Sequence, residues 1–145
     1  MKKKIWIYIF ILEIVGCAEP FQTYPVSDPI FDQYINQYTL DKELYAGTSE
    51  VSRIVISLKD IKDPYVIGEC TLGRSYNIIH IDSDYWFHAT TTDTDRLLLI
   101  YHEMGHCDLG IHEHDQDYTI MNAYHLSPSR FDYNPDFYLR NLFLR

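Results

Sequence analysis

The chain has 145 residues, 46% of them hydrophobic, a size that supports one domain with a single core and leaves little room for a second. Acidic residues outnumber basic ones, 21 to 12, and the formal net charge is −9 at pH 7. A chain this acidic is a poor partner for the phosphate backbone of nucleic acid, and we expect a monomer that does not bind nucleic acid.

The amino terminus has the composition of an export signal. Lysines at positions 2–4 precede an apolar stretch at residues 5–12, and a glycine lies directly before Cys17. A small residue before cysteine is typical of lipoprotein signal peptides, in which cleavage leaves that cysteine as the lipidated first residue. The apolar stretch is too short to span a bilayer. We predict a signal peptide at residues 1–16 and a lipid-anchored protein of the bacterial cell envelope; secretory cleavage after Ala18 is the alternative.

A tether and a first helix follow. Residues 17–27 contain two prolines and lack hydrophobic periodicity, which indicates a lipidated tether ahead of a folded domain at residues 28–145. Asp28 and Pro29 can open a helix, and apolar residues recur at helical spacing as far as about Leu40.

The middle of the chain predicts a sheet. Residues 51–58 alternate, with Ile54 and Ile56 on one face and Ser57 on the other, and residues 77–82 form a second candidate strand. Residues 60–68 are expected to form a loop and a further short strand.

A helix after this sheet carries the most informative motif. Thr94 or Asp95 can cap it, and an apolar run then leads into residues 102–106, which read His-Glu-Met-Gly-His. Because residues four apart share one face of a helix, His102 and His106 can present two imidazoles to one metal ion. Glu103 would then face a water on that metal, the arrangement of a metallopeptidase.

The last predicted element is a C-terminal helix. Asn134 and Pro135 supply a cap and a proline in the first turn. The residues that follow place five large apolar side chains where they can close the core: Phe137, Tyr138, Leu139, Leu142 and Phe143.

Further motifs give the chain a family resemblance. They are Gly68-Glu69-Cys70, the Ile-His-Ile-Asp of residues 79–82, Trp86, the His-Glu-x-Gly-His-Cys of residues 102–107, and a methionine-containing turn at residues 118–124. Together they resemble the metzincin zinc peptidases and, more closely, a family of small bacterial metzincin-like lipoproteins, over roughly residues 50 to 125.

The resemblance implies an α+β fold, in which a short mixed sheet packs on the active-site helix with N- and C-terminal helices around it. It also implies that Met121 packs beneath the metal without binding it, and it offers Tyr124 as a donor to the transition state.

The third metal ligand is open to two assignments. His112 lies ten residues after His102, the metzincin spacing, and we favour it because spacing from the first ligand constrains a tetrahedral site. Glycine stands one position later than in metzincins, at Gly110, so a turn one residue longer would bring in His114 instead. Four nearby carboxylates are candidates to orient the ligand imidazoles: Asp108, Glu113, Asp115 and Asp117.

The cysteines predict one disulfide. With Cys17 assigned to lipid, Cys70 and Cys107 remain as a pair in a compartment where disulfides persist. Their bond would tie the sheet to the active-site helix. Metal binding by Cys107 is the weaker alternative, because on a helix its side chain projects about 100° away from that of His106.

These features predict a zinc-dependent endopeptidase anchored to a membrane through Cys17, acting on a peptide or protein substrate. One catalytic Zn²⁺ would be held by His102, His106 and His112, with Glu103 as general base on the zinc-activated water. The alternatives are a zinc-dependent hydrolase of cell-wall peptides and a catalytically silent zinc-containing binding lipoprotein.

Overall fold

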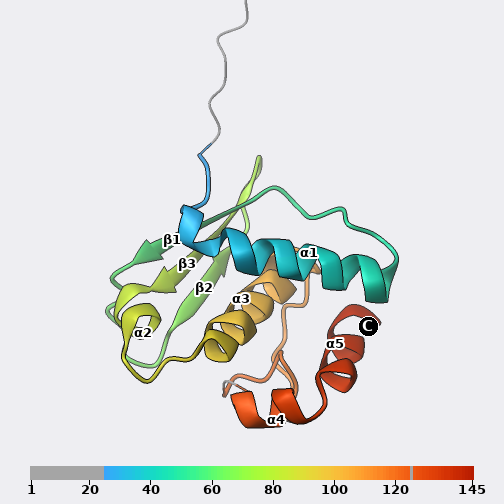
Figure 1. Cartoon of the computed structure of the whole chain (residues 1–145). Helices are drawn as coiled ribbons and strands as arrows, with labels where there is room; N and C mark the ends of the chain where they lie inside the picture. Colours follow the sequence, from blue (N-terminus) through green and yellow to red (C-terminus); the bar gives the residue numbers. More distant parts are fainter. Residues whose placement is uncertain (1–24, 125) are drawn as a thin grey trace, which may run out of the picture.

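The computed structural model describes residues 25–124 and 126–145, which form an α+β domain (Figure 1). Within these residues lie a three-stranded sheet, a short 3-10 helix and five α-helices. The predicted α+β class is confirmed. The predicted signal peptide, Cys17 and most of the tether lie outside the described residues.

The sheet is mixed, with β3 in the centre. β1 (Ile54–Lys59) runs parallel to β3 (Asn77–Asp82), and β2 (Gly68–Thr71) pairs antiparallel on the other side of β3. The two strands predicted at residues 51–58 and 77–82 are confirmed. The third strand begins only at Gly68, because Asp63 closes a turn by accepting backbone hydrogen bonds from the two residues after Pro64.

The central helix, α3 (Asp93–Cys107), packs against β2 and β3 on one side and against α1 on another (Figure 1). Its cap is Thr92, two or three residues earlier than the expected Thr94 or Asp95. The Thr92 hydroxyl accepts from the backbone N–H of Asp95, and the Asp95 carboxylate accepts from that of Thr92. This reciprocal capping box satisfies two N–H groups at the helix start, whereas a later cap would leave them unpaired.

The remaining helices surround α3. After the 3-10 helix η1 (Pro29–Phe31), α1 (Asp32–Ala46) runs past the expected end at Leu40 and stops at Gly47, whose φ of 74° is the left-handed conformation that ends helices. α5 (Pro135–Phe143) begins at the predicted Asn134 cap. The sequence patterns did not predict the short helices α2 (Ser83–Phe87) and α4 (Pro128–Tyr133).

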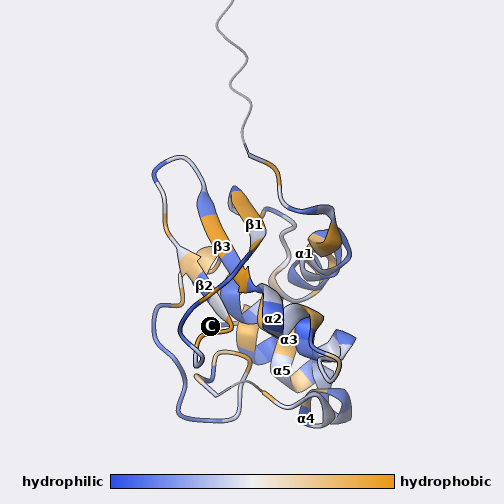
Figure 2. Ribbon diagram, turned by 90° about the vertical axis from the view of Figure 1, so that its left-hand side faces the viewer, coloured by the Kyte–Doolittle hydropathy of each residue, from blue (hydrophilic) through white to orange (hydrophobic). Residues whose placement is uncertain are grey.

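Aromatic side chains make up much of the core. Phe31 and Tyr34 pack edge-on against Trp86, with ring centroids 4.8 and 5.3 Å apart. Tyr38 of α1 meets Tyr101 of α3 at 5.2 Å, and both rings are fully buried. The hydropathy colouring in Figure 2 shows hydrophobic residues along β1 and β3 and on parts of the helices. These contacts place α3 rigidly between the sheet and α1.

A buried ion pair ties α1 to the end of α3. Lys42 donates to the Asp108 carboxylate at 2.7 Å and to the carbonyl oxygen of Glu50 at 2.5 Å, and the side chains of the pair are 9% and 1% exposed. Tyr38 and the backbone N–H of Ser52 donate to the same carboxylate. Both oxygens of this buried carboxylate therefore accept hydrogen bonds.

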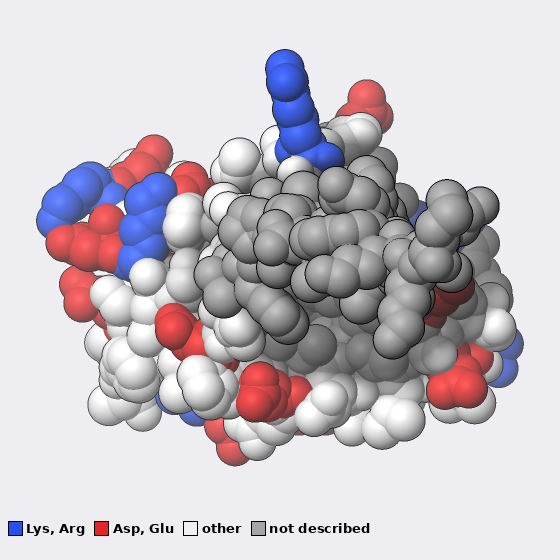
Figure 3. Space-filling view, turned by 90° about the horizontal axis from the view of Figure 1, so that it is seen from above, with Lys and Arg blue, Asp and Glu red and all other residues white. Residues whose placement is uncertain are grey.

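Charged side chains of both signs lie on the described surface. In the view from above, acidic side chains are scattered over the visible face, and basic side chains at its left end lie beside acidic ones (Figure 3). Within the described residues, no helix is both long and apolar enough to cross a membrane.

Candidate metal centre

Two histidines on α3 form the base of the site. His102 and His106 are one helical turn apart on the same face, and their Nε2 atoms lie 3.2 Å from each other. This is the geometry that the His-Glu-Met-Gly-His motif predicts.

The third histidine of the cluster is His114. Its Nε2 atom lies 3.2 Å from the Nε2 atoms of both His102 and His106, so the three nitrogens form an equilateral triangle. His112, which the metzincin spacing favoured, does not join this group; it lines the neighbouring cavity instead. The structure thus groups His114, the alternative third ligand, with His102 and His106.

The path of the chain explains this difference. Beyond the end of α3, Gly110 adopts a φ of 69°, and the backbone N–H of Ile111 returns to the Gly105 carbonyl oxygen at 3.0 Å. The next anchored residue is Asp115, whose N–H donates to the carbonyl oxygen of Met121 at 2.9 Å. His114 is the residue just before this anchor, and its Nε2 atom reaches the two histidines of α3.

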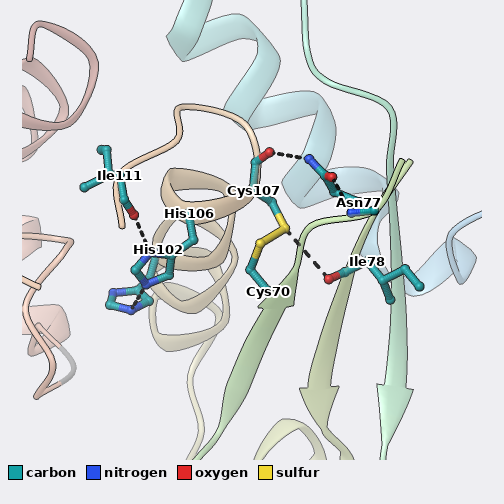
Figure 4. Close-up of a disulfide and its surroundings, with 8 residues drawn as sticks. Cys70, Asn77, Ile78, His102, His106, Cys107 and Ile111 are labelled. Carbon is teal, nitrogen blue, oxygen red and sulfur yellow. Dashed lines mark hydrogen bonds between the residues drawn. A yellow bond between two sulfur atoms is a disulfide. The ribbon is translucent and has the colours of Figure 1, made fainter. Parts of the chain in front are cut away.

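Backbone carbonyl groups orient the two helical imidazoles. Nδ1 of His102 bonds to the carbonyl oxygen of Ile120 at 2.7 Å, and Nδ1 of His106 bonds to that of Ile111 (Figure 4). A carbonyl oxygen can only accept, so both Nδ1 atoms carry the proton and both Nε2 atoms keep a lone pair. Burial lowers the pKa of His106, although the hydrogen bond to Ile111 opposes it. The neutral imidazole that results is the form that binds a metal ion.

The triangle fits a metal ion. Three neutral imidazole nitrogens suit Zn²⁺, Cu²⁺, Ni²⁺ or iron. For Zn–N bonds of about 2.0–2.1 Å, ideal tetrahedral angles separate the ligand nitrogens by about 3.3–3.4 Å, close to the 3.2 Å found here. An ion above the triangle would keep a fourth position for water or substrate. Three converging lone pairs without a cation would repel one another.

Glu103 lies beside the cluster as a buried carboxylate. Its residue is 4% exposed, and burial, with a smaller contribution from Glu69, raises the pKa of Glu103 to about 8. An adjacent metal cation would lower this pKa again by favouring the charged form. A carboxyl group with such opposed influences can exchange a proton near neutral pH.

Two glycines let the surrounding elements approach the site. A Cβ at Gly68 of β2 would lie 2.6 Å from an oxygen of the Glu103 carboxylate, so a larger residue there would force this carboxylate to shift. A Cβ at Gly105 would lie 2.3 Å from the sulfur of Met121, which is fully buried under α3. Met121 therefore packs against α3 through a gap that the glycine of the motif leaves open.

Two cavities adjoin the cluster. One, of about 370 Å³, is lined by Cys70, Leu72 and His112 among others; a second, of about 160 Å³, is lined by Ile67, Leu99 and Ala123 among others. Both cavities share four residues at the centre of the site: Gly68, His102, Glu103 and His114.

A disulfide secures one wall of the site. The sulfur atoms of Cys70 on β2 and Cys107 at the end of α3 are 2.02 Å apart, which confirms the predicted pairing (Figure 4). The Asn77 side chain donates to the carbonyl oxygen of Cys107 at 2.7 Å. Cys107 faces the sheet, while His106 faces the cleft. The disulfide thus holds the edge strand β2 against α3.

Several expected roles fall elsewhere. Tyr124 is 87% exposed and lines neither of the two cavities beside the cluster. Asp108 binds Lys42 and not a ligand imidazole, and backbone carbonyls orient both helical histidines. The sequence motif that contains Gly68 gave no hint of its contact with Glu103. No sequence signal pointed to Arg145, whose guanidinium group donates to the Asp115 carboxylate at 3.0 Å. The sequence does contain a signal for close packing at Gly105, because this residue is the glycine inside the His-Glu-Met-Gly-His motif.

Comparisons of the chain with models of protein families, with curated proteins and with solved structures found no match. The fold and the site define an α+β domain with three histidines placed to hold one metal ion, and a buried glutamate beside them. These features themselves carry the inference about function.

Proposed function

We propose that this protein is a zinc-dependent metallopeptidase of metzincin-like character. The observation that carries the proposal is the triangle of His102, His106 and His114 nitrogens, each pair 3.2 Å apart, with Glu103 lining the same cleft. His114 takes the place of His112 as third ligand in this proposal. Zn²⁺ is the ion for which a three-imidazole set with one open position is typical in hydrolases.

Zinc, when bound, supplies a Lewis acid that acidifies a water molecule and polarises the scissile carbonyl group. The proton transfers and the support of the site are assigned to residues of the chain. Glu103 accepts the proton of the attacking water and delivers it to the leaving amine. Gly68 lets β2 lie close to the Glu103 carboxylate, and Met121 packs against α3 at Gly105. The hydrogen bonds to Ile120 and Ile111 keep two imidazoles in the metal-binding tautomer.

The shape of the site supports cleavage within a chain over removal of terminal residues. The two cavities share Glu103 and His102 and extend from them to different residues, Leu72 in one and Ala123 in the other. A peptide can therefore lie across the site with residues on both sides of the scissile bond, which is what an endopeptidase requires. The edge strand β2 borders both cavities through Gly68.

The proposal includes the cell-envelope location that the amino terminus predicts. The anchor is a lipid on Cys17, and the substrate is a peptide or protein outside the cytoplasm. The disulfide between Cys70 and Cys107 supports an oxidising compartment, because such bonds persist there.

The first test is metal content and peptide hydrolysis of the purified full-length chain, beside Glu103→Gln. We expect one zinc per chain, hydrolysis of an unstructured protein substrate such as casein, and loss of hydrolysis with zinc retained in Glu103→Gln. Zinc bound without hydrolysis of any protein or peptide would contradict the peptidase. Hydrolysis confined to isolated peptidoglycan would instead favour the cell-wall hydrolase.

A second comparison identifies the third ligand. His114→Ala should lose most of its zinc, whereas His112→Ala, the matched control two residues away, should keep it. The opposite result would restore the metzincin spacing and contradict the placement of the loop.

A further inference from the structure

We propose that Arg145 and Asp115 form a positioning pair that holds the loop of the third histidine in place, so that the docking of α5 completes the metal centre. The inference rests on the metal site of the proposed function, and it concerns residues that do not touch the metal themselves.

The pair links the end of the chain to the residue next to His114. Nη1 of Arg145 donates to Oδ1 of Asp115 at 3.0 Å, and Nη2 donates to Oδ2. This is the two-pronged geometry in which a guanidinium group grips a carboxylate with a defined orientation. Arg145 is held in turn by Asn141, whose carbonyl and side-chain oxygens accept from it at 2.9 and 2.8 Å.

Asp115 uses its remaining polar groups to close the loop. Its backbone N–H donates to the Met121 carbonyl oxygen at 2.9 Å, its carbonyl oxygen accepts from the Asn122 side chain at 3.2 Å, and its carboxylate accepts from Thr119. The segment that it closes carries Ile120, whose carbonyl orients His102, and Met121 beneath α3. One residue therefore joins the third histidine to two supports of the site.

The third histidine depends on such a support more than the other two. His102 and His106 stand on a rigid helix and are oriented by carbonyl groups. His114 comes from an irregular loop and is exposed, and the nearest anchored residue is Asp115. Ordering a loop residue costs conformational entropy, and a contact that orders it before the metal arrives removes that cost from metal binding.

The location of α5 makes the connection rigid. Leu142 is buried and reaches the space beside Gly105, within 3.5 Å of where a Cβ would stand. Three residues further along, Arg145 meets the loop. The side chains of Arg145 and Asp115 are 29% and 26% exposed, so solvent screens the pair and its contribution to overall stability is small. Its loss should change metal binding far more than folding.

The test measures zinc affinity of the full-length chain by competition with a chromophoric chelator. It also measures the visible spectrum of the Co²⁺-loaded chain, which reports the ligand geometry. The variants are Arg145→Ala, Arg145→Lys and Asp115→Asn. Arg140→Ala is the matched control, because Arg140 pairs with Asp136 on the exposed surface of α5.

We expect Arg145→Ala and Asp115→Asn to bind zinc about 10- to 100-fold more weakly, as is typical when outer partners of metal ligands are removed. Their Co²⁺ spectra should change, while Arg140→Ala matches the wild type in both measurements. Arg145→Lys should bind zinc more tightly than Arg145→Ala but less tightly than the wild type, since lysine keeps the charge but lacks the two parallel donors of the guanidinium group. If Arg145→Ala fails to fold, the zinc affinity of Arg145→Lys tests the inference in its place, and an affinity equal to that of the wild type would contradict it.

An affinity of Arg145→Ala within twofold of the wild type would overturn the inference, and so would an equal loss in Arg140→Ala. If the wild-type chain binds no metal ion, the metal site and this inference fall together. If the wild type binds zinc but hydrolyses nothing, the peptidase fails while the positioning pair can still be upheld by the affinities.

Discussion

Replacement of Gly105 by alanine tests the packing beneath the metal centre. The glycine lies in the last turn of α3, between Glu103 and His106, and a Cβ there would stand 2.3 Å from the Met121 sulfur and 3.0 Å from its terminal methyl carbon. Ordinary contacts between such atoms are about 3.5–4.0 Å, so the methionine must move by about 1.5 Å. Met121 is fully buried and has little space to do so.

The expected magnitude is a balance of two opposed effects. Overpacking a core costs about 1–3 kcal/mol, whereas alanine in place of glycine within a helix contributes about 1 kcal/mol of stability. We therefore expect Gly105→Ala to lower the free energy of unfolding by about 1 kcal/mol. We also expect weaker zinc binding, because the displaced Met121 follows Ile120, the residue that orients His102.

Denaturant titration of the metal-free chain measures the first effect and chelator competition the second. The companion variant is Met121→Ala, which removes the obstructing atoms at a cost of about 2–5 kcal/mol for the cavity left behind. In that background, Gly105→Ala should be neutral or stabilising by up to about 1 kcal/mol. If Gly105→Ala stabilises the otherwise unaltered protein by the full helix-propensity value, the steric reasoning is wrong.

Three further perturbations follow from the structure. Gly68→Ala should abolish most hydrolysis with zinc binding kept, since the added carbon meets the carboxylate of Glu103 at 2.6 Å; unchanged turnover would contradict that contact. Reduction of the Cys70–Cys107 bond, which spans 37 positions of sequence, should lower the free energy of unfolding by about 3–4 kcal/mol, measured by denaturant titration with and without reductant. Lys42→Met should cost about 3–5 kcal/mol, because it leaves a buried carboxylate without its cation; a melting temperature equal to the wild type would show that water replaces the lysine.

The sequence by itself determined the elements whose signals are local. His102, Glu103 and His106 share one turn of a helix, so their mutual placement follows from helical geometry alone. The start of α5 follows from the Asn134 side chain, which accepts from the backbone of the first turn. The pairing of Cys70 with Cys107 followed from cysteine count and compartment.

Only the tertiary structure decided which histidine completes the cluster. Beyond Gly110 the chain has no periodic element, so local spacing does not set its register, and spacing alone favoured His112. Contacts outside any regular element select His114: the backbone of Asp115 bonds to Met121, six residues later, and its side chain bonds to Arg145, thirty residues away. Sequence patterns likewise did not predict the sheet order. β1 pairs directly with β3 although β2 lies between them in the sequence, and this pairing depends on what the whole core buries. Local geometry placed the helical half of the site, and long-range packing placed the loop that completes it.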